Sequence, residues 1–172
     1  MNFRLLLLPF CFIACLDAEP PADAPKPFFD LAGYMDAEVD RWEALNEPVT
    51  KTALVNGDEA TRTVSDLNFE ESLAPFRRAD INRPAWLDQY AVDSTENVVT
   101  YRALSDDLRT RFLTVERTDG EVIRIKIENQ TDSPVTKTRQ FLTYEPLQRF
   151  EIRATQRVVT LDSTTLRILV ER

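Results

Sequence analysis

The second half of the chain alternates apolar and polar residues with a period of two. Ile123, Ile125 and Ile127 alternate with charged residues, and similar stretches follow between Pro-, Asp- and Ser-containing turns. One-sided alternation in consecutive strands joined by turns is typical of an antiparallel meander with one face on a core and the other in water. We therefore predict strands over 99–103, 109–117, 121–129, 135–144, 148–160 and 164–171.

Upstream of these strands the apolar residues recur three and four positions apart. The positions are Phe28, Leu31, Met35, Val39, Trp42 and Leu45. This spacing is typical of an amphipathic helix, here over 28–45, and Pro48 blocks its continuation. We expect its aromatic-rich face to cover the sheet.

Two shorter elements should lie between this helix and the meander. The Asn-Gly pair at 56–57 favours a positive-φ turn, which predicts a hairpin over 49–64. Asn68, with a glutamate three residues later, indicates the start of a short helix that Pro75 should kink or split. The fold class is then α+β: a curved antiparallel sheet of about six to eight strands, covered on one face by the two helices.

Residues 1–14 read as a secretory signal peptide. Arg4 precedes an apolar run over 5–14, which as a helix would be roughly 15 Å long against a hydrocarbon core of about 30 Å. A cation, a short apolar stretch and a small residue at its end are typical of a cleaved signal and not of a membrane span.

Phe12-Ile13-Ala14-Cys15 resembles a bacterial lipobox, with Phe12 where leucine is usual. The resemblance implies cleavage before Cys15 and lipidation of its sulfur and new N-terminus. The alternative is an ordinary signal cut near Ala14 or Ala18, with Cys15 incidental. Since two or more acyl chains hold a protein stably on a membrane, a lipidated Cys15 would be a permanent anchor.

Residues 15–27 would comprise the lipidated cysteine and a tether rich in proline and acid. Twelve such residues could span roughly 37 Å in an extended, semi-rigid form. Asp17 and Glu19 resemble the acids that follow the cysteine in surface-exported lipoproteins of Bacteroidota, although they could equally just keep a linker soluble. Residues 28–172 have the length of a single α+β domain.

Composition excludes most catalytic arrangements. The chain has no histidine and only three glycines, so His-based nucleophile systems, His-ligated zinc and a Gly-rich phosphate cradle are not expected. We therefore expect no cofactor, no metal and no enzymatic activity, although a pair of carboxylates could still hydrolyse a substrate. A formal net charge of -8 disfavours nucleic acid as a partner.

Basic residues gather at the outward positions of the predicted strands. They could form a docking face for an acidic partner, or they could shield the sheet through cross-strand pairs with Glu116, Glu128 and Glu151. The residues are Arg102, Arg124, Lys126, Lys137, Arg139, Arg149 and Arg153.

The stretch 73–90 has no strong helix or strand period, yet it carries several aromatic residues. We consider Trp42, Phe76, Trp86 and Tyr90 as candidates for a pocket or interface between sheet and helices; alternatively, Trp86 and Tyr90 plug one end of the sheet. Together with Cys15, the first helix and the later "LTYEP", this stretch resembles small uncharacterised lipoproteins of Bacteroidota. The resemblance implies a localisation and a fold but no active site.

The leading hypothesis is a noncatalytic lipoprotein, held at the outer membrane through Cys15, that binds or assembles an envelope protein partner on its periplasmic or cell-surface face. A second hypothesis is a carrier of an apolar ligand or lipid in a half-barrel pocket. A carboxylate-dependent hydrolase is the third.

Overall fold

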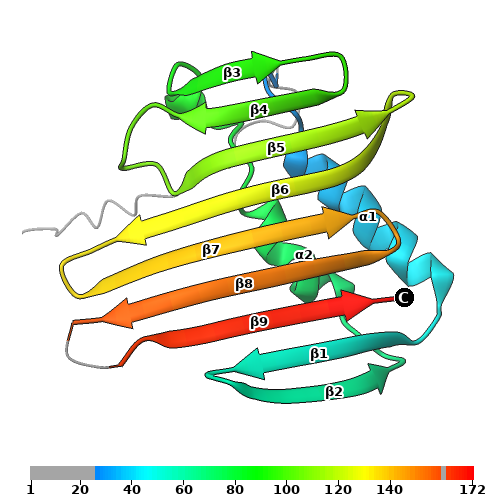
Figure 1. Cartoon of the computed structure of the whole chain (residues 1–172). Coiled ribbons are helices and arrows are strands. Elements are labelled where there is room, and N and C mark those ends of the chain that lie inside the picture. The colour runs from blue at the N-terminus through cyan, green and yellow to red at the C-terminus, as the bar shows by residue number, and fades with distance from the viewer. Residues whose placement is uncertain (1–25, 160–161) are drawn as a thin grey trace, which may run out of the picture.

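The computed structural model describes residues 26–159 and 162–172. The predicted signal peptide, Cys15 and all but the last two residues of the tether lie outside the described residues. The described elements in chain order are α1 (Leu31–Leu45), β1 (Val49–Val55), β2 (Asp58–Val64), α2 (Phe69–Arg77), the 3-10 helix η1 (Pro84–Trp86), β3 (Tyr90–Ser94), β4 (Val98–Ala103), β5 (Thr110–Thr118), β6 (Glu121–Asp132), β7 (Thr136–Glu145), β8 (Arg149–Val158) and β9 (Thr164–Glu171) (Figure 1).

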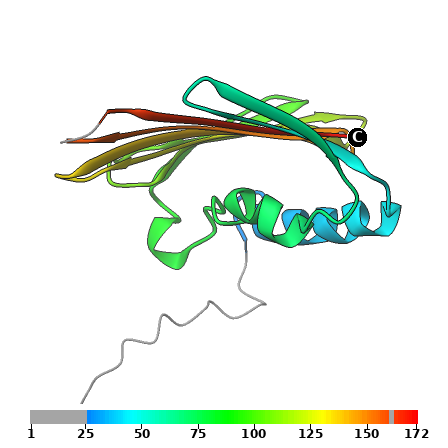
Figure 2. The same ribbon diagram turned by 90° about the horizontal axis from the view of Figure 1, so that it is seen from below.

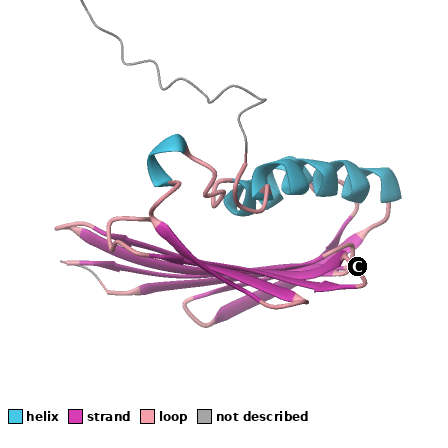
Figure 3. Cartoon of the chain, turned by 90° about the horizontal axis from the view of Figure 1, so that it is seen from above, coloured by secondary structure: helices cyan, strands magenta, loops and turns pink. Residues whose placement is uncertain are grey.

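The described strands form one antiparallel sheet in the order β2-β1-β9-β8-β7-β6-β5-β4-β3. Strands β3 to β9 are a meander, and the β1–β2 hairpin, which comes first in the chain, pairs with the last strand, β9 (Figure 1). The sheet is curved, and α1 and α2 lie on its concave face (Figures 2 and 3). The α+β class and the helix-covered curved sheet are thus confirmed.

The predicted strands are confirmed, and one further strand lies at an edge of the sheet. The described residues hold nine strands instead of about six to eight, because β3 forms where the sequence shows no clear period. Only one of its side chains, Tyr90, is buried, so this short edge strand has almost no alternation to reveal it. Both predicted tight turns adopt the expected backbone: φ is 52° at Asn56 and 101° at Gly57, and 52° and 85° at the pair 119–120.

Side-chain caps fix where both helices begin. Asp30 Oδ1 accepts a hydrogen bond from the Gly33 amide at 3.0 Å, so α1 begins at Leu31, three residues later than the apolar spacing indicates. Asn68 Oδ1 accepts one from the Glu71 amide at 2.8 Å and caps α2 as predicted. Pro75 does not split α2, which continues to Arg77.

The core lies between the helices and the middle strands. Phe76 of α2 packs edge-on against Tyr144 and Phe150, with ring centroids 5.9 and 6.2 Å apart. Trp42 of α1 meets Phe150 at 6.3 Å and stacks on Phe69 at 5.1 Å. Edge-to-face and stacked contacts of this kind add to the free energy gained by burying the rings.

The outer face of the sheet carries a network of cross-strand ion pairs. Glu116 pairs with Arg124 and Lys126 at 3.0 and 2.6 Å, and Glu128 pairs with Arg139 at 2.6 Å. On the neighbouring strands Glu151 pairs with Arg167 across the strands and with Arg153 along β8, and Glu145 pairs with Arg124 and Arg149 across the strands. The second of the two predicted roles, cations shielding the sheet through cross-strand glutamates, is therefore confirmed for the three glutamates named.

Candidate functional site

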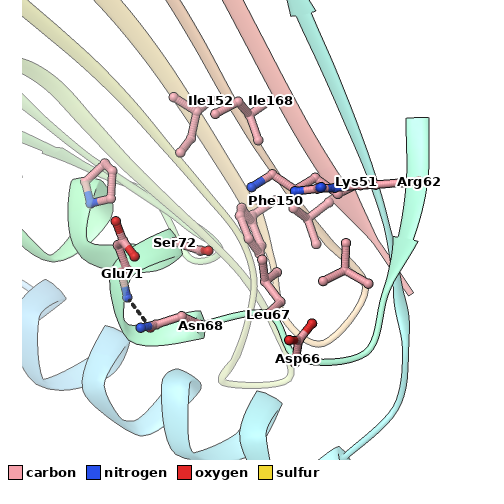
Figure 4. Close-up of a pocket in the computed structure, with 13 residues that line it drawn as sticks. Lys51, Arg62, Asp66, Leu67, Asn68, Glu71, Ser72, Phe150, Ile152 and Ile168 are labelled. Carbon is pink, nitrogen blue, oxygen red and sulfur yellow. Dashed lines mark hydrogen bonds between the residues drawn. The ribbon is translucent and has the colours of Figure 1, made fainter. Parts of the chain in front are cut away.

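A cleft of about 440 Å³ lies between α2 and the inner face of the sheet at the β1–β2 end (Figure 4). Its floor is apolar and consists of Phe150 and Ile152 from β8 and Ile168 and Val170 from β9. The β1–β2 hairpin forms one wall, and the segment 66–75 forms the other. Small-molecule sites have volumes of about 300–1,000 Å³ and mainly apolar linings, so this cleft falls in the usual range.

Strand register explains why these side chains meet. Phe150 lies opposite Val170, and Ile152 lies opposite Ile168, so all four point to the inner face. On the next strand Lys51 lies opposite Val170, which places the lysine on the same face. The β1–β2 hairpin thus extends the inner face beyond α2, as Figure 1 shows, and leaves the cleft between them.

The two walls carry opposite charge. Lys51 and Arg62 stand on the hairpin side, and Figure 4 shows both side chains reaching in over Phe150. Glu71 stands on the other side, in the first turn of α2, and Asp66 lies on the link between β2 and α2. Within the described residues none of these four makes an ion pair shorter than 4.0 Å.

A buried polar network lies beside the cleft's floor, under α1. Glu38 is only 1% exposed, and its Oε2 accepts a hydrogen bond from the Tyr144 hydroxyl at 2.5 Å. That hydroxyl in turn accepts one from Trp42 Nε1 at 2.9 Å, while Arg41 pairs with the other carboxylate oxygen. Burial raises the pKa of the Tyr144 phenol well above its ordinary value, and the hydrogen bond to Glu38 raises it further. Each of these side-chain polar atoms has a hydrogen-bond partner, so the network holds α1 on β7.

The sequence contained a sign of this network. Glu38 lies three residues after Met35 and four before Trp42, so it falls on the apolar stripe of the helix. A glutamate at a core position of an amphipathic helix needs a buried partner, because an unpaired buried charge is very costly. The partner itself, Tyr144, is 106 residues away and could not be deduced from spacing.

The four candidate pocket residues do not form one site, and none of them is among the described residues that line the cleft. Trp42 and Phe76 are brought together in the core through Phe150. Tyr90 is buried near the opposite edge of the sheet, 6.0 Å from the Phe28 ring, and donates a hydrogen bond to the Thr110 carbonyl at 2.8 Å.

Burial raises the pKa of the Tyr90 phenol to about 12. Trp86 is half-buried in η1, where the Arg83 guanidinium lies 4.6 Å above its ring. The cleft residues Lys51 and Arg62 were missed, because the hairpin pattern does not show which of its faces is the inner one.

Among the residues that the structure describes, no helix combines the length and the apolar character needed to cross a bilayer. Nor does that part of the chain bring three or more His, Cys, Asp or Glu side chains together as a metal site would require. No protein-family model, curated protein or solved structure matches the chain. The resemblance to small lipoproteins of Bacteroidota therefore stays a prediction made from the sequence.

Proposed function

We propose that this protein is a noncatalytic binding protein that carries an apolar ligand in the cleft between α2 and the β1–β2 end of the sheet. The observation that supports it is the cleft itself: a volume of about 440 Å³ over an apolar floor, bounded by polar side chains on both walls. A few polar groups around an apolar lining are typical of sites that bind small organic molecules. The buried carboxylate of Glu38 is bonded to the Tyr144 hydroxyl and to Arg41, and it is not part of the cleft's lining.

We further propose that the carrier is anchored to the outer membrane through lipidated Cys15. The lipobox-like residues and the proline- and acid-rich tether support this. Close to where the described chain begins, the Phe28 amide donates a hydrogen bond to Asn82 Oδ1 at 3.1 Å. Globomycin treatment with intact-mass analysis of wild type and Cys15→Ala tests the anchor: acyl mass at Cys15 supports it, and its absence contradicts it.

Ligand binding is tested with the Cys15→Ala chain, which cannot be lipidated. A neutral phenylnaphthylamine probe, whose fluorescence rises in apolar surroundings, should bind this chain. Ser72→Trp places an indole in the cleft from α2 and should weaken probe binding by about tenfold or more, whereas the same change at exposed Ser163, outside the cleft, should have no effect. Absence of probe binding, or equal binding by both tryptophan variants, would overturn the proposal.

A hollow on the outer face favours a second candidate, the binding of an envelope protein. It measures about 450 Å³ and is lined by Lys137, Arg139, Phe141, Thr155 and Arg157, among others. The Phe141 ring is half-buried, with the Arg139 guanidinium 4.9 Å above it. An aromatic residue framed by arginine is the composition of many interface hot spots. Photocrosslinking from position 141 in intact cells should give one discrete product that Arg157→Glu abolishes, and a smear that this variant leaves unchanged would count against this candidate.

A further inference from the structure

We infer that the ligand of the cleft is a single-chain amphiphile with an anionic head, a carboxylate or a phosphate, which Lys51 and Arg62 bind while its aliphatic chain lies along β9. This inference rests on the proposed carrier function and adds the chemical class of the ligand. The alternatives, a neutral or a cationic amphiphile, are separated from it by the experiment below.

The two cations stand side by side on the inner face of the hairpin. Lys51 of β1 and Arg62 of β2 are directly opposite in the antiparallel register, a position in which Cβ atoms are about 4.5–5.5 Å apart. Like charges directly opposite each other destabilise a sheet. An anion between the two side chains would relieve that repulsion and satisfy both of them.

Lys51 and Arg62 differ from the other cation pairs that lie directly opposite each other in the described sheet, because in each of those pairs at least one member has a carboxylate partner. On the outer face, Arg124, Lys126 and Arg139 each have a glutamate within 3.0 Å. Lys51 and Arg62 have no carboxylate within 4.0 Å in the described part of the chain, although Asp66 and Glu71 line the same cleft. The hairpin wall therefore offers positive charge that the protein itself does not neutralise.

The acidic wall orients the ligand. Glu71 lies on α2 across the cleft from the cations, and Asp66 lies on the link between β2 and α2 (Figure 4). Both would repel an anionic head, so the head is directed to the inner face of the hairpin. Asp58, which also points to the inner face of β2, lies four residues from Arg62 at the turn end of the hairpin, roughly 13 Å away along the strand. Arginine suits this site because its planar guanidinium donates two parallel hydrogen bonds to a carboxylate or a phosphate.

An apolar track continues from the cleft toward the hairpin turn. Beyond Ile168 the inner face of β9 carries Leu166, which lies opposite Ala154 on β8 and Val55 on β1. Leu166 and Ala154 are half-buried, and Val55 is 43% exposed. An aliphatic chain lying on this track would remove these side chains from water, which is the main driving force for binding such a ligand.

The test uses the Cys15→Ala chain and competition against the bound phenylnaphthylamine probe. The competitors are dodecanoate, dodecyl phosphate, dodecanol and dodecyltrimethylammonium, which share one chain and differ in the head. At low salt the two anions should displace the probe at concentrations about tenfold below dodecanol, and the cation should be the weakest. If the anions compete no better than dodecanol, the inference is wrong, whereas the carrier function, which needs only probe binding, stands.

Charge-removing variants assign the effect to the two side chains. Lys51→Gln with Arg62→Gln should remove the advantage of both anions while probe affinity changes less than about twofold, and each single change should remove part of it. Arg102→Gln, an exposed cation on the outer face of β4, is the matched control and should change nothing. An anion preference that survives the double change would overturn the assignment. Preference for dodecyl phosphate over dodecanoate points to a phosphate-headed lipid, and the reverse order points to a free fatty acid.

Discussion

Replacing Tyr144 by phenylalanine tests whether the buried network under α1 stabilises the fold. The change removes one oxygen and leaves the ring contacts to Phe76 unchanged. Glu38 Oε2 then loses its donor and Trp42 Nε1 its acceptor, and both groups are buried. A hydrogen bond to a charged group contributes about 1.5–3 kcal/mol, and an unsatisfied buried donor costs about 1–3 kcal/mol. We expect the free energy of unfolding to fall by about 3 kcal/mol.

Urea unfolding followed by circular dichroism measures this change through the midpoint and the slope of the transition. A loss of 3 kcal/mol would be a large fraction of the roughly 5–15 kcal/mol that stabilises a typical domain. The control is Glu38→Leu combined with Tyr144→Phe, which removes the carboxylate together with its donor. This double variant should be at least about 1 kcal/mol more stable than Tyr144→Phe alone, because it removes the buried carboxylate oxygen that has lost its hydrogen-bond donor. A Tyr144→Phe variant within about 0.5 kcal/mol of wild type would refute the argument.

Three further predictions concern the surface network, a helix cap and a buried phenol. Hydrogen bonds from Lys126 to Glu116 and from Arg149 to Glu145 hold the pKa of each carboxyl below its ordinary value of 4.5. The two ionised carboxylates therefore stabilise the fold fully above pH 4.5, and this stabilisation should be lost as the pH falls further. In unfolding melts from about pH 6 to 3, the stability of Glu145→Gln should decline less than that of the wild type. In urea unfolding, Asp30→Ala should lower the free energy of unfolding by about 1 kcal/mol, whereas Asp30→Asn keeps the helix cap and should lower it by less. Equal losses in the two variants would show that the ion pair of Asp30 with Lys26, and not the cap, provides the stabilisation. Burial raises the pKa of the Tyr90 phenol from 10.0 to about 12, so the neutral phenol stabilises the fold fully below pH 10, and this stabilisation should be lost as the pH rises toward 12. In alkaline unfolding melts, the stability of Tyr90→Phe should decline less steeply with pH than that of the wild type, and an equally steep decline would contradict this prediction.

The sequence predicted those parts of the fold that depend on neighbouring residues. Hairpin turns, the Asn68 cap and the alternating strands of the meander are local features, and the structure has them close to the expected bounds. The pairing of β1 with β9 joins residues more than a hundred positions apart, and no local pattern encodes it. The cleft depends on that pairing, since Lys51 meets Val170 only when the hairpin docks beside the last strand. The cleft could therefore not be predicted from the sequence, although most of the strands and helices that form it could.

The candidate site residues chosen from the sequence proved to be core residues or to lie away from the cleft. Aromatic content marked Trp42 and Phe76, and both are core residues that touch Phe150 from two different helices. An aromatic side chain on an amphipathic helix is a sign of burial, whether the burial is against protein or against a ligand. The pair that distinguishes the cleft, Lys51 and Arg62, looks in the sequence like two ordinary surface cations of an edge hairpin.

The size of the sheet explains why a cleft exists at all. Nine strands at about 4.8 Å spacing make a sheet roughly 38 Å across, whereas two α-helices about 10 Å in diameter cover roughly 20 Å when packed side by side. The chain makes part of the remaining inner face polar, with Asp58 and Arg62 on β2, but leaves Val55 and Leu166 apolar next to them. A ligand that covers those apolar side chains binds the folded state alone, so binding and folding are linked: at about one hundred times its dissociation constant it would add about 2.7 kcal/mol to the stability. The open apolar strip contributes little to the stability of the empty protein, and in the proposed carrier the same strip would supply the affinity for the ligand.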